Sequence, residues 1–318
     1  MNERPDSTDA LDDLAAALAS VAPVVRHAPS APLTTYRVGG SIDTLIAVDS
    51  IEQLLGVSGL LTDPSVPVAV IGRGSNLLVL DGGFRGVAMR LGPTFEAVHV
   101  AVDGTVDAGG ATPLPVLARQ SAGLGFRGLE FFVGIPGTVG GAVRMNAGGH
   151  GRETVEVLCD ATILRLGESV VTRRGVDDLG LAFRSSALGD RDLVVGARFA
   201  ATPGSIDDAR AEIDEVVRRR REHQPGGQNC GSVLVNPPGD AAGRLVELAG
   251  LKQHRVGGAF VSEKHANFIQ ADATASAADI VRLIAEVRAR VLEVTGIDLR
   301  TELRVIGDPP RPSTELRT

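Results

Sequence analysis

Two glycine-rich stretches of the 318-residue chain hold residue types suited to binding phosphate groups. In the longer one, residues 134–149, six of sixteen residues are glycine. Glycine lets backbone N–H groups approach an anion closely, so a phosphate-bearing cofactor is the natural ligand. We expect an irregular segment, because glycine costs backbone entropy in a helix or strand. A flexible surface loop is the alternative, but the apolar Ile135, Val139, Val143 and Met145 are unsuited to one.

The shorter stretch, Gly72 to Asn76, directly follows residues 68–71, which predict a buried strand. Its serine, asparagine and backbone amides suit an anion, although a structural turn explains it equally well. It is not a dinucleotide fingerprint, because Leu77 stands where the third glycine belongs. Two such stretches in one chain favour cofactor binding. The predicted cofactor-binding residues are Gly72, Arg73, Gly74, Ser75, Asn76, Gly134, Ile135, Pro136, Gly137, Thr138, Gly140, Gly141 and Asn146.

The bulk composition excludes several classes of partner. A net charge of −7 without a basic tail argues against nucleic acid and anionic membranes. The polar start of the chain is no signal peptide, and no apolar run approaches the ~18 residues of a membrane span. Cys159 and Cys230 form no disulfide framework, and the six histidines show no metal-ligand spacing with them. We expect a cytoplasmic, metal-free monomer.

Helices are predicted wherever apolar periodicity meets a start or stop signal. They cover residues 11–18, follow a capping box at 50–53, and run from 112 to 123. Another begins at Ser205 and ends in the arginines 218–221, which we interpret as a solvated helix end rather than a binding patch. A long helix with Ile280 to Val291 along one stripe is stopped by glycine.

Strands and hairpins lie between these helices. Strands are predicted at 68–71, 87–91 and 193–199, and an alternating strand at 299–305. Hairpins are predicted at 98–108, around an Asp-Gly turn, and at 161–172. Because the order lacks regular βαβ alternation, the predicted class is α+β, with a domain boundary near residues 200–225.

Eight motifs, taken in order, resemble a known enzyme family. The chain resembles the UDP-N-acetylenolpyruvoylglucosamine reductases, flavoenzymes that make UDP-N-acetylmuramate for peptidoglycan, from about Leu33 to Gly307. The motifs are residues 34–40, 72–76, 134–149, 183–186, 229–237, 249–252, 262–269 and 301–307.

The resemblance implies a fold shared with vanillyl-alcohol-oxidase-type flavoproteins. It implies a partly disordered N-terminal extension over 1–20, an FAD-binding domain over 21–205 with two subdomains split near 92, a substrate-binding domain over 206–307 and a loose tail over 308–318. It also implies non-covalent FAD, NADPH as the reductant and a nucleotide-sugar substrate. The chain resembles the shorter class of these enzymes, which lacks an inserted tyrosine-bearing loop, and its single tyrosine, Tyr36, agrees with this.

The implied reaction reduces an enolpyruvyl ether, with a hydride from flavin N5 reaching the β-carbon and a proton reaching the α-carbon. Such chemistry needs a proton donor and a charge stabiliser. Ser232 matches the family's proton donor, and the alternative is a turn serine after a glycine. A serine hydrolase is disfavoured, because the flanking residues form no nucleophile elbow.

Two charged residues match the other catalytic positions. Arg184 matches the arginine that engages the substrate carboxylate and the developing enolate, for which a planar guanidinium is suited. Its alternative is a surface ion pair with Asp177, Asp178 or Asp190. Glu302 matches the C-terminal catalytic glutamate, and its alternative is a cross-strand ion pair; its neighbouring arginines favour the carboxylate form.

The substrate-binding residues implied by the resemblance are Asn236, Lys264, His265 and Asn267. Asn236 is the strongest of these for the nucleotide sugar, whereas His265 by itself is more typical of a structural histidine. The family often has an aromatic and then a basic residue before Asn236, where this chain has Leu234 and Val235. Loss of that cation weakens diphosphate binding.

Two other functions stay open. A related flavoenzyme that acts on a different acceptor is suggested by Leu234 and Val235. A non-catalytic nucleotide-sugar-binding module is harder to reconcile with both glycine stretches and with Arg184, Ser232 and Glu302. A colourless protein that cannot be reconstituted with FAD would favour that module.

Overall fold

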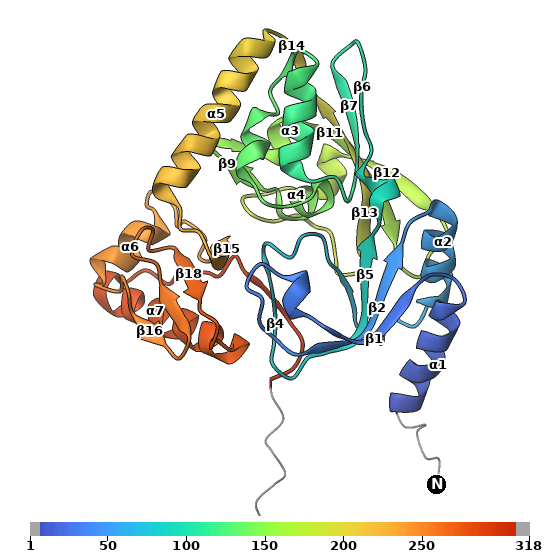
Figure 1. The fold of residues 1–318 in the computed structure, drawn as a ribbon, viewed down its shortest axis with the longest axis horizontal. Coiled ribbons are helices and arrows are strands. Elements are labelled where there is room, and N and C mark those ends of the chain that lie inside the picture. Colours follow the sequence, from blue (N-terminus) through green and yellow to red (C-terminus); the bar gives the residue numbers. More distant parts are fainter. Residues whose placement is uncertain (1–6, 310–318) are drawn as a thin grey trace, which may run out of the picture. The chain divides into compact units, whose positions relative to one another are not determined.

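The structure, a computed structural model, describes residues 7–309 and divides into two compact units (Figure 1). Unit 1 contains the chain up to Arg26, Thr44–Gly72 and Gly86–Glu222. Unit 2 contains His27–Asp43, Arg73–Arg85 and the chain from His223 onward. The predictions for residues 1–6 and 310–318 lie outside the described residues, and the predicted domain limits stay predictions. None of the described helices is long and apolar enough to cross a membrane.

A four-stranded sheet, mostly within unit 1, has the order β1-β2-β5-β3, with β3 parallel to β5. Its strands are β1 (Val24–Pro29), β2 (Ser41–Val48), β3 (Val68–Val70) and β5 (Phe84–Leu91). Helices α1 (Ser7–Ala19) and α2 (Ile51–Leu60) pack on it through Leu18, Leu54 and Val57. The hydroxyl of Ser50 caps α2 by accepting a hydrogen bond from Gln53 N at 3.1 Å, which confirms the predicted helix start.

The second sheet of unit 1 is antiparallel, with the order β12-β11-β13-β7-β6. Both predicted hairpins are confirmed, since Leu164 pairs with Val171 and Val98 with Ala108. The strands are β6 (Val98–Val100), β7 (Thr105–Gly109), β11 (Leu158–Arg165), β12 (Val171–Gly175) and β13 (Asp192–Ala200).

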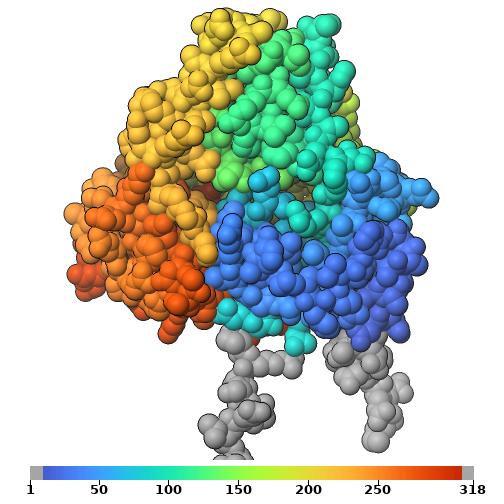
Figure 2. All heavy atoms as spheres, in the orientation of Figure 1, coloured from blue at the N-terminus to red at the C-terminus, as the bar shows by residue number. Residues whose placement is uncertain are grey.

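Three helices share a core with this second sheet: α3 (Leu114–Gly123), α4 (Val139–Met145) and α5 (Ile206–His223). The core contains Phe132 edge-on to Phe199, with ring centroids 5.6 Å apart. Figure 2 shows α5 in yellow on the surface of unit 1. Arg218 and Arg219 near its end both pair with Glu215, which supports the solvated helix end predicted there.

Unit 2 contains a four-stranded antiparallel sheet with the order β15-β18-β17-β16. Helix α7 (Ala277–Thr295) packs on it through the predicted apolar stripe and ends at Gly296, whose φ is 73°. The other elements are α6 (Ala242–Leu248), β15 (Gln228–Ser232), β16 (Arg255–Val256), β17 (Ala259–Val261) and β18 (Phe268–Ala271).

A parallel pair of short strands joins distant parts of the chain in unit 2. In this pair β4 (Leu77–Val79) lies beside β19 (Arg304–Ile306). The predicted strand over 299–305 is therefore wrong for its first five residues. There the chain makes only an isolated bridge, between Leu234 and Thr301. The alternation of apolar and polar residues suggested a strand. A strand also needs a neighbouring strand to hydrogen-bond with along its length.

Short elements complete the described chain, and its mixture of helices and largely antiparallel sheets confirms the α+β class. The strands are β8 (Phe126–Arg127), β9 (Gly148–Gly149), β10 (Arg152–Glu153) and β14 (Thr202–Pro203). The 3-10 helices are η1 (Ala31–Leu33), η2 (Pro93–Glu96), η3 (Glu130–Gly134), η4 (Thr154–Glu156) and η5 (Val176–Leu179).

Candidate functional site

The stretch from Gly72 to Asn76 offers unused backbone donors. Within the described residues, the N–H groups of Arg73, Gly74 and Ser75 donate no hydrogen bond. Gly74 has a φ of +60°, and a Cβ there would lie 2.0 Å from the carbonyl oxygen of Leu33. The loop can therefore fold this tightly only with glycine, and its free amides fit a phosphate-bearing cofactor.

The longer glycine stretch is not the irregular segment that we expected. Residues 139–145 form helix α4, capped by Thr138, whose hydroxyl accepts from Gly141 N at 3.4 Å. Gly140 packs against the backbone of Gly110, and a Cβ there would lie 3.1 Å from the carbonyl oxygen of Gly110. Its N–H donates to that same oxygen at 2.9 Å and is not available to a ligand. Close packing of the helix thus explains Gly140.

The two glycine stretches meet within unit 1. A Cβ on Gly72 would lie 2.7 Å from the hydroxyl oxygen of Thr138, so glycine is needed for this contact. Of the other predicted cofactor residues, Pro136 is exposed, Ile135 and Gly137 are half-buried, and Gly134 packs against His150. This contact brings one residue of each stretch together, and a shared ligand for the two stretches stays a prediction.

Asn146 ends α4 and is buried, with 1% of its surface exposed. Its Nδ2 donates to Glu153 Oε2 at 2.9 Å and to the carbonyl oxygen of Ala182 at 3.0 Å. Its Oδ1 accepts from Val155 N at 2.9 Å. Both ends of the amide are thus engaged by the protein, so the predicted cofactor contact of Asn146 stays a prediction without support in this geometry.

Arg184 lies in a tight turn of unit 1. Ala182 and Ser185 exchange two backbone hydrogen bonds of 3.0 Å, and Arg184 between them has a φ of 57°. Its guanidinium stacks on the ring of Phe183, 4.8 Å from the centroid, and lies 3.4 Å from a carboxylate oxygen of Glu153. Glu153 was not among the acidic partners considered from the sequence, because nothing in the residue spacing links positions 153 and 184.

Ser232 ends β15 in unit 2, where the strand is irregular. The pairing register with β18 shifts between Asn229 and Ser232, and Gly231 between them has a φ of +73°. Asn229 Oδ1 accepts from Gly231 N at 3.0 Å. This bend leaves Ser232 half-buried at the end of the strand, so a turn role and a catalytic role are both compatible with its position.

Cys230 anchors the same strand. Its Sγ is buried, 3.3 Å from the hydroxyl of Thr35 and 3.6 Å from the carbonyl oxygen of Leu77. Burial raises the pKa of the Cys230 thiol to about 11. The residue is therefore protonated and unreactive at neutral pH, and its role is packing.

Glu302 lies beside the Ser232 strand. Its N–H donates to the carbonyl oxygen of Val233 at 2.8 Å, directly after Ser232. Its own carbonyl oxygen accepts from Asn76 Nδ2 at 3.1 Å. Unit 2 therefore brings together the end of the first glycine stretch and the segments of Ser232 and Glu302, while Arg184 belongs to unit 1.

The predicted substrate-binding residues differ in how the protein uses them. Asn267 is buried and clamps Leu234, accepting from its N–H at 2.9 Å and donating to its carbonyl oxygen at 2.8 Å. Asn236 is exposed, and its Oδ1 accepts from the N–H of Ala242 at the start of α6. His265 packs edge-on to Phe268, and burial lowers its pKa, which favours the neutral ring. Asn267 and His265 thus both make contacts that stabilise the fold of unit 2.

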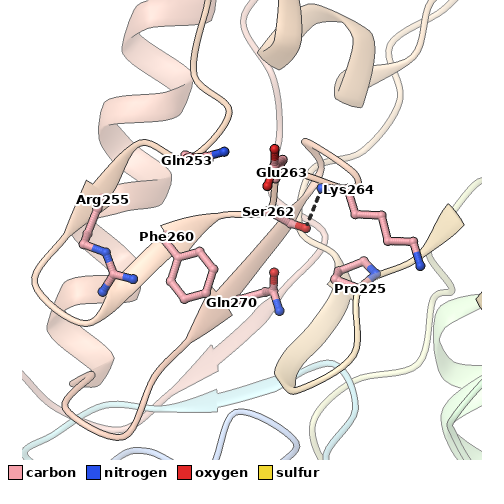
Figure 3. Close-up of a pocket in the computed structure, with 8 residues that line it drawn as sticks. All are labelled: Pro225, Gln253, Arg255, Phe260, Ser262, Glu263, Lys264 and Gln270. Carbon is pink, nitrogen blue, oxygen red and sulfur yellow. Dashed lines mark hydrogen bonds between the residues drawn. The ribbon is translucent and has the colours of Figure 1, made fainter.

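Lys264 lines a surface cavity of about 660 Å³ in unit 2 (Figure 3). Its backbone N–H donates to the hydroxyl of Ser262 at 3.2 Å. Across the cavity, the guanidinium of Arg255 stacks on Phe260, 4.6 Å from the ring centroid. The remaining lining residues are Pro225, Gln253, Glu263 and Gln270. Arg255 is paired with Asp272 and Glu263 adds a carboxylate, so Lys264, the ring and the two amides are the groups that suit an anionic, planar ligand.

No group of three or more His, Cys, Asp or Glu side chains within residues 7–309 could hold a metal ion. Two family models match separate parts of the chain. Residues 42–173 match the family model of the FAD binding domain. Residues 222–306 match that of the UDP-N-acetylenolpyruvoylglucosamine reductase C-terminal domain.

Similar proteins carry the same description. The chain is 44% identical, over 87% of its length and 93% of the relative's, to UDP-N-acetylenolpyruvoylglucosamine reductase of Rubrobacter xylanophilus. It is also 44% identical to that of Caulobacter vibrioides, over 87% and 92%. The crystal structure of the Thermus caldophilus enzyme superposes with a TM-score of 0.76 at 33% identity, over 90% of this chain and 99% of that one.

Proposed function

The chain belongs to the family of UDP-N-acetylenolpyruvoylglucosamine reductases, FAD-dependent enzymes of peptidoglycan precursor synthesis, and we propose that it reduces UDP-N-acetylglucosamine enolpyruvate to UDP-N-acetylmuramate with NADPH. The observation that carries the proposal is the convergence in unit 2 of Ser232, Glu302 and Asn76. A proton donor, a carboxylate and a cofactor loop on one framework are what this reduction requires.

The cofactor is assigned to the first glycine stretch and to the start of α4. The unused N–H groups of Arg73, Gly74 and Ser75 fit its phosphates, and Thr138 lies against Gly72. When bound, FAD supplies hydride transfer between NADPH and the enolpyruvyl group. Proton donation, charge stabilisation and substrate binding belong to side chains of this protein.

Ser232 gives the proton to the α-carbon. A hydroxyl is a weak acid, but a carbanionic centre is a strong base, so a well-placed serine suffices. Arg184 pairs with the substrate carboxylate and with the enolate charge that develops beside it, for which its rigid fork is suited. The backbone N–H of Glu302 holds this residue next to the Ser232 strand, and Glu302 serves as the family's C-terminal catalytic glutamate.

The nucleotide sugar is assigned to Asn236 and Lys264. Leu234, which replaces the family's usual aromatic residue, is buried and clamped by Asn267, so it cannot cover the ligand. Lys264, exposed at the cavity of Figure 3, supplies a cation in place of the one missing at Val235. A monomeric state and a cytoplasmic location are part of this proposal.

Ser232→Ala tests the assignment in two half-reactions. Reduction of the flavin by NADPH should stay near the wild-type rate, and anaerobic reoxidation by the enolpyruvyl substrate should slow by roughly 10²–10⁴. The matched control is Ser65→Ala, at an exposed serine of unit 1. Equal losses in both half-reactions would assign Ser232 a structural role.

The wild-type protein separates the alternatives. Reoxidation with UDP-N-acetylmuramate as the product supports the reductase. Reduction by NADPH without reoxidation would favour a flavoenzyme with a different acceptor, and would direct attention to Leu234 and Val235. A colourless protein that FAD cannot reconstitute would favour the binding module.

A further inference from the structure

The hairpin of β9 and β10 places Glu153 opposite Gly148 in unit 1. The two residues are paired in register, and the turn between the strands consists of His150 and Gly151, both with positive φ. Glu153 is also the N-cap residue of η4, where its N–H donates to Glu156 Oε1 at 2.7 Å and fixes its backbone. The Glu153 side chain therefore starts from a rigid backbone.

The guanidinium of Arg184 lies against both residues of this pair. Its Nη2 donates to the carbonyl oxygen of Gly148 at 3.1 Å, and its Nη1 lies 3.4 Å from Glu153 Oε1. A Cβ on Gly148 would lie 2.6 Å from the carbonyl oxygen of Arg152 and 2.7 Å from Nη1, so glycine here serves the hairpin as well as the approach of the guanidinium. The side chains of Arg184 and Glu153 are 20% and 27% exposed, which limits screening of the pair by solvent.

The second oxygen of Glu153 is tied to the turn that carries Arg184. Glu153 Oε2 accepts from Asn146 Nδ2, and the same Nδ2 donates to the carbonyl oxygen of Ala182, at the base of the turn. One carboxylate thus contacts the guanidinium directly, and through Asn146 it also holds the backbone from which that guanidinium extends.

We propose that Glu153 is a positioning residue for Arg184, with Asn146 as its link to the turn. It holds the guanidinium in the orientation that binds the substrate carboxylate, so the arginine side chain is preorganised before the substrate arrives. This inference rests on the proposed function of Arg184, and it adds two residues that contact neither cofactor nor substrate in the proposal.

The test is Glu153→Gln, which keeps the size and one acceptor oxygen but removes the charge. Reoxidation of the reduced holoenzyme by the enolpyruvyl substrate should slow by about 10- to 100-fold, while NADPH reduces the flavin at the wild-type rate. The matched control is Glu212→Gln, since Glu212 forms another partly exposed arginine pair of unit 1, with Arg127 at 2.8 Å. The control should reoxidise like the wild type.

A double-mutant cycle separates positioning from a general structural effect. In an Arg184→Ala background, Glu153→Gln should slow reoxidation by no more than about twofold, because it acts through the missing arginine. The same 10- to 100-fold loss in both backgrounds, or unchanged or faster reoxidation in Glu153→Gln alone, would overturn the inference.

A crystal structure of the Glu153→Gln variant gives a readout that does not depend on the substrate. Displacement of the Arg184 guanidinium from the carbonyl oxygen of Gly148 supports the inference, and an unmoved guanidinium contradicts it. Failure of the wild-type protein to be reoxidised would contradict the proposed function instead, and the position of Arg184 would still decide the role of Glu153.

Discussion

Asp81 caps helix α7 from a distant part of unit 2, and removing its carboxylate should measurably destabilise that unit. Its two oxygens accept from Ala277 N at 3.0 Å and from Ala278 N at 2.8 Å, the first two N–H groups of the helix. Ser276 caps Asp279 N and has no part in these two bonds. Asp81→Ala therefore leaves two helical donors without their acceptor.

The magnitude follows from the two contributions that are lost. Replacing a capping side chain by alanine costs about 0.5–2 kcal/mol, and an anion at a helix N-terminus contributes about 0.3–1 kcal/mol. Because Asp81 is half-buried and makes two bonds, we expect Asp81→Ala to lower the free energy of unfolding by about 2 kcal/mol. Asp81→Asn should cost about half as much, since an amide oxygen still accepts but carries no charge.

The assay can follow unit 2 specifically. The chain has no tryptophan, and its one tyrosine, Tyr36, is fully buried in unit 2, so tyrosine fluorescence during urea unfolding reports that unit. The control is Asp308→Ala, because Asp308 forms an exposed ion pair with Arg85 in the same unit. If Asp81→Ala destabilised the protein no more than Asp308→Ala does, the capping argument would be refuted.

Three further predictions concern pH, sterics and a buried hydroxyl. The N–H of Ser276 helps to hold the pKa of Asp279 at about 2. The Asp279 carboxylate therefore stabilises the fold fully above about pH 4, and this contribution is lost as the pH falls toward 2. Asp279→Asn should reduce the dependence of the unfolding free energy on pH in this range. Gly148→Ala should clash with the carbonyl oxygen of Arg152 and with the Arg184 guanidinium, and so weaken substrate binding about tenfold. The measurement is a titration followed by flavin absorbance, and wild-type affinity would contradict the prediction. Tyr36→Phe should cost about 1–2 kcal/mol by circular dichroism, because a buried carbonyl of β18 loses its donor; no loss would show that the bond is dispensable.

Elements with a local signal were predictable from the sequence. The capping box at Ser50 starts α2, the Asp103-Gly104 turn joins β6 to β7, and Gly296 ends α7. In each case the residues that form the signal also make the hydrogen bonds or adopt the backbone angles that define the element. No distant partner has to be known for such a prediction.

Features that depend on distant partners could not be predicted in this way. Gly140 and Gly141 suggested a loop, but they lie in a helix, where a Cβ on Gly140 would crowd the carbonyl oxygen of Gly110 at 3.1 Å. Asn146 was predicted as a cofactor contact because it lies in the longer glycine stretch, and Asn267 as a substrate contact because the family resemblance implies it. In the structure both hold backbone groups that lie far along the chain, and sequence spacing does not reveal such partners.

The parallel pair of β4 and β19 has a consequence for how the chain is made. More than two hundred residues separate these strands, so β4 leaves the ribosome long before its neighbour exists. Closing so long a loop is slow, and the edge of β4 is open to wrong pairing until the segment of β19 has been synthesised. The segment from His223 onward also lacks Asp81 and β4 when it is made alone, so it is not a separable module. Gene fusions and truncations of this protein must therefore keep the chain whole from β1 to β19.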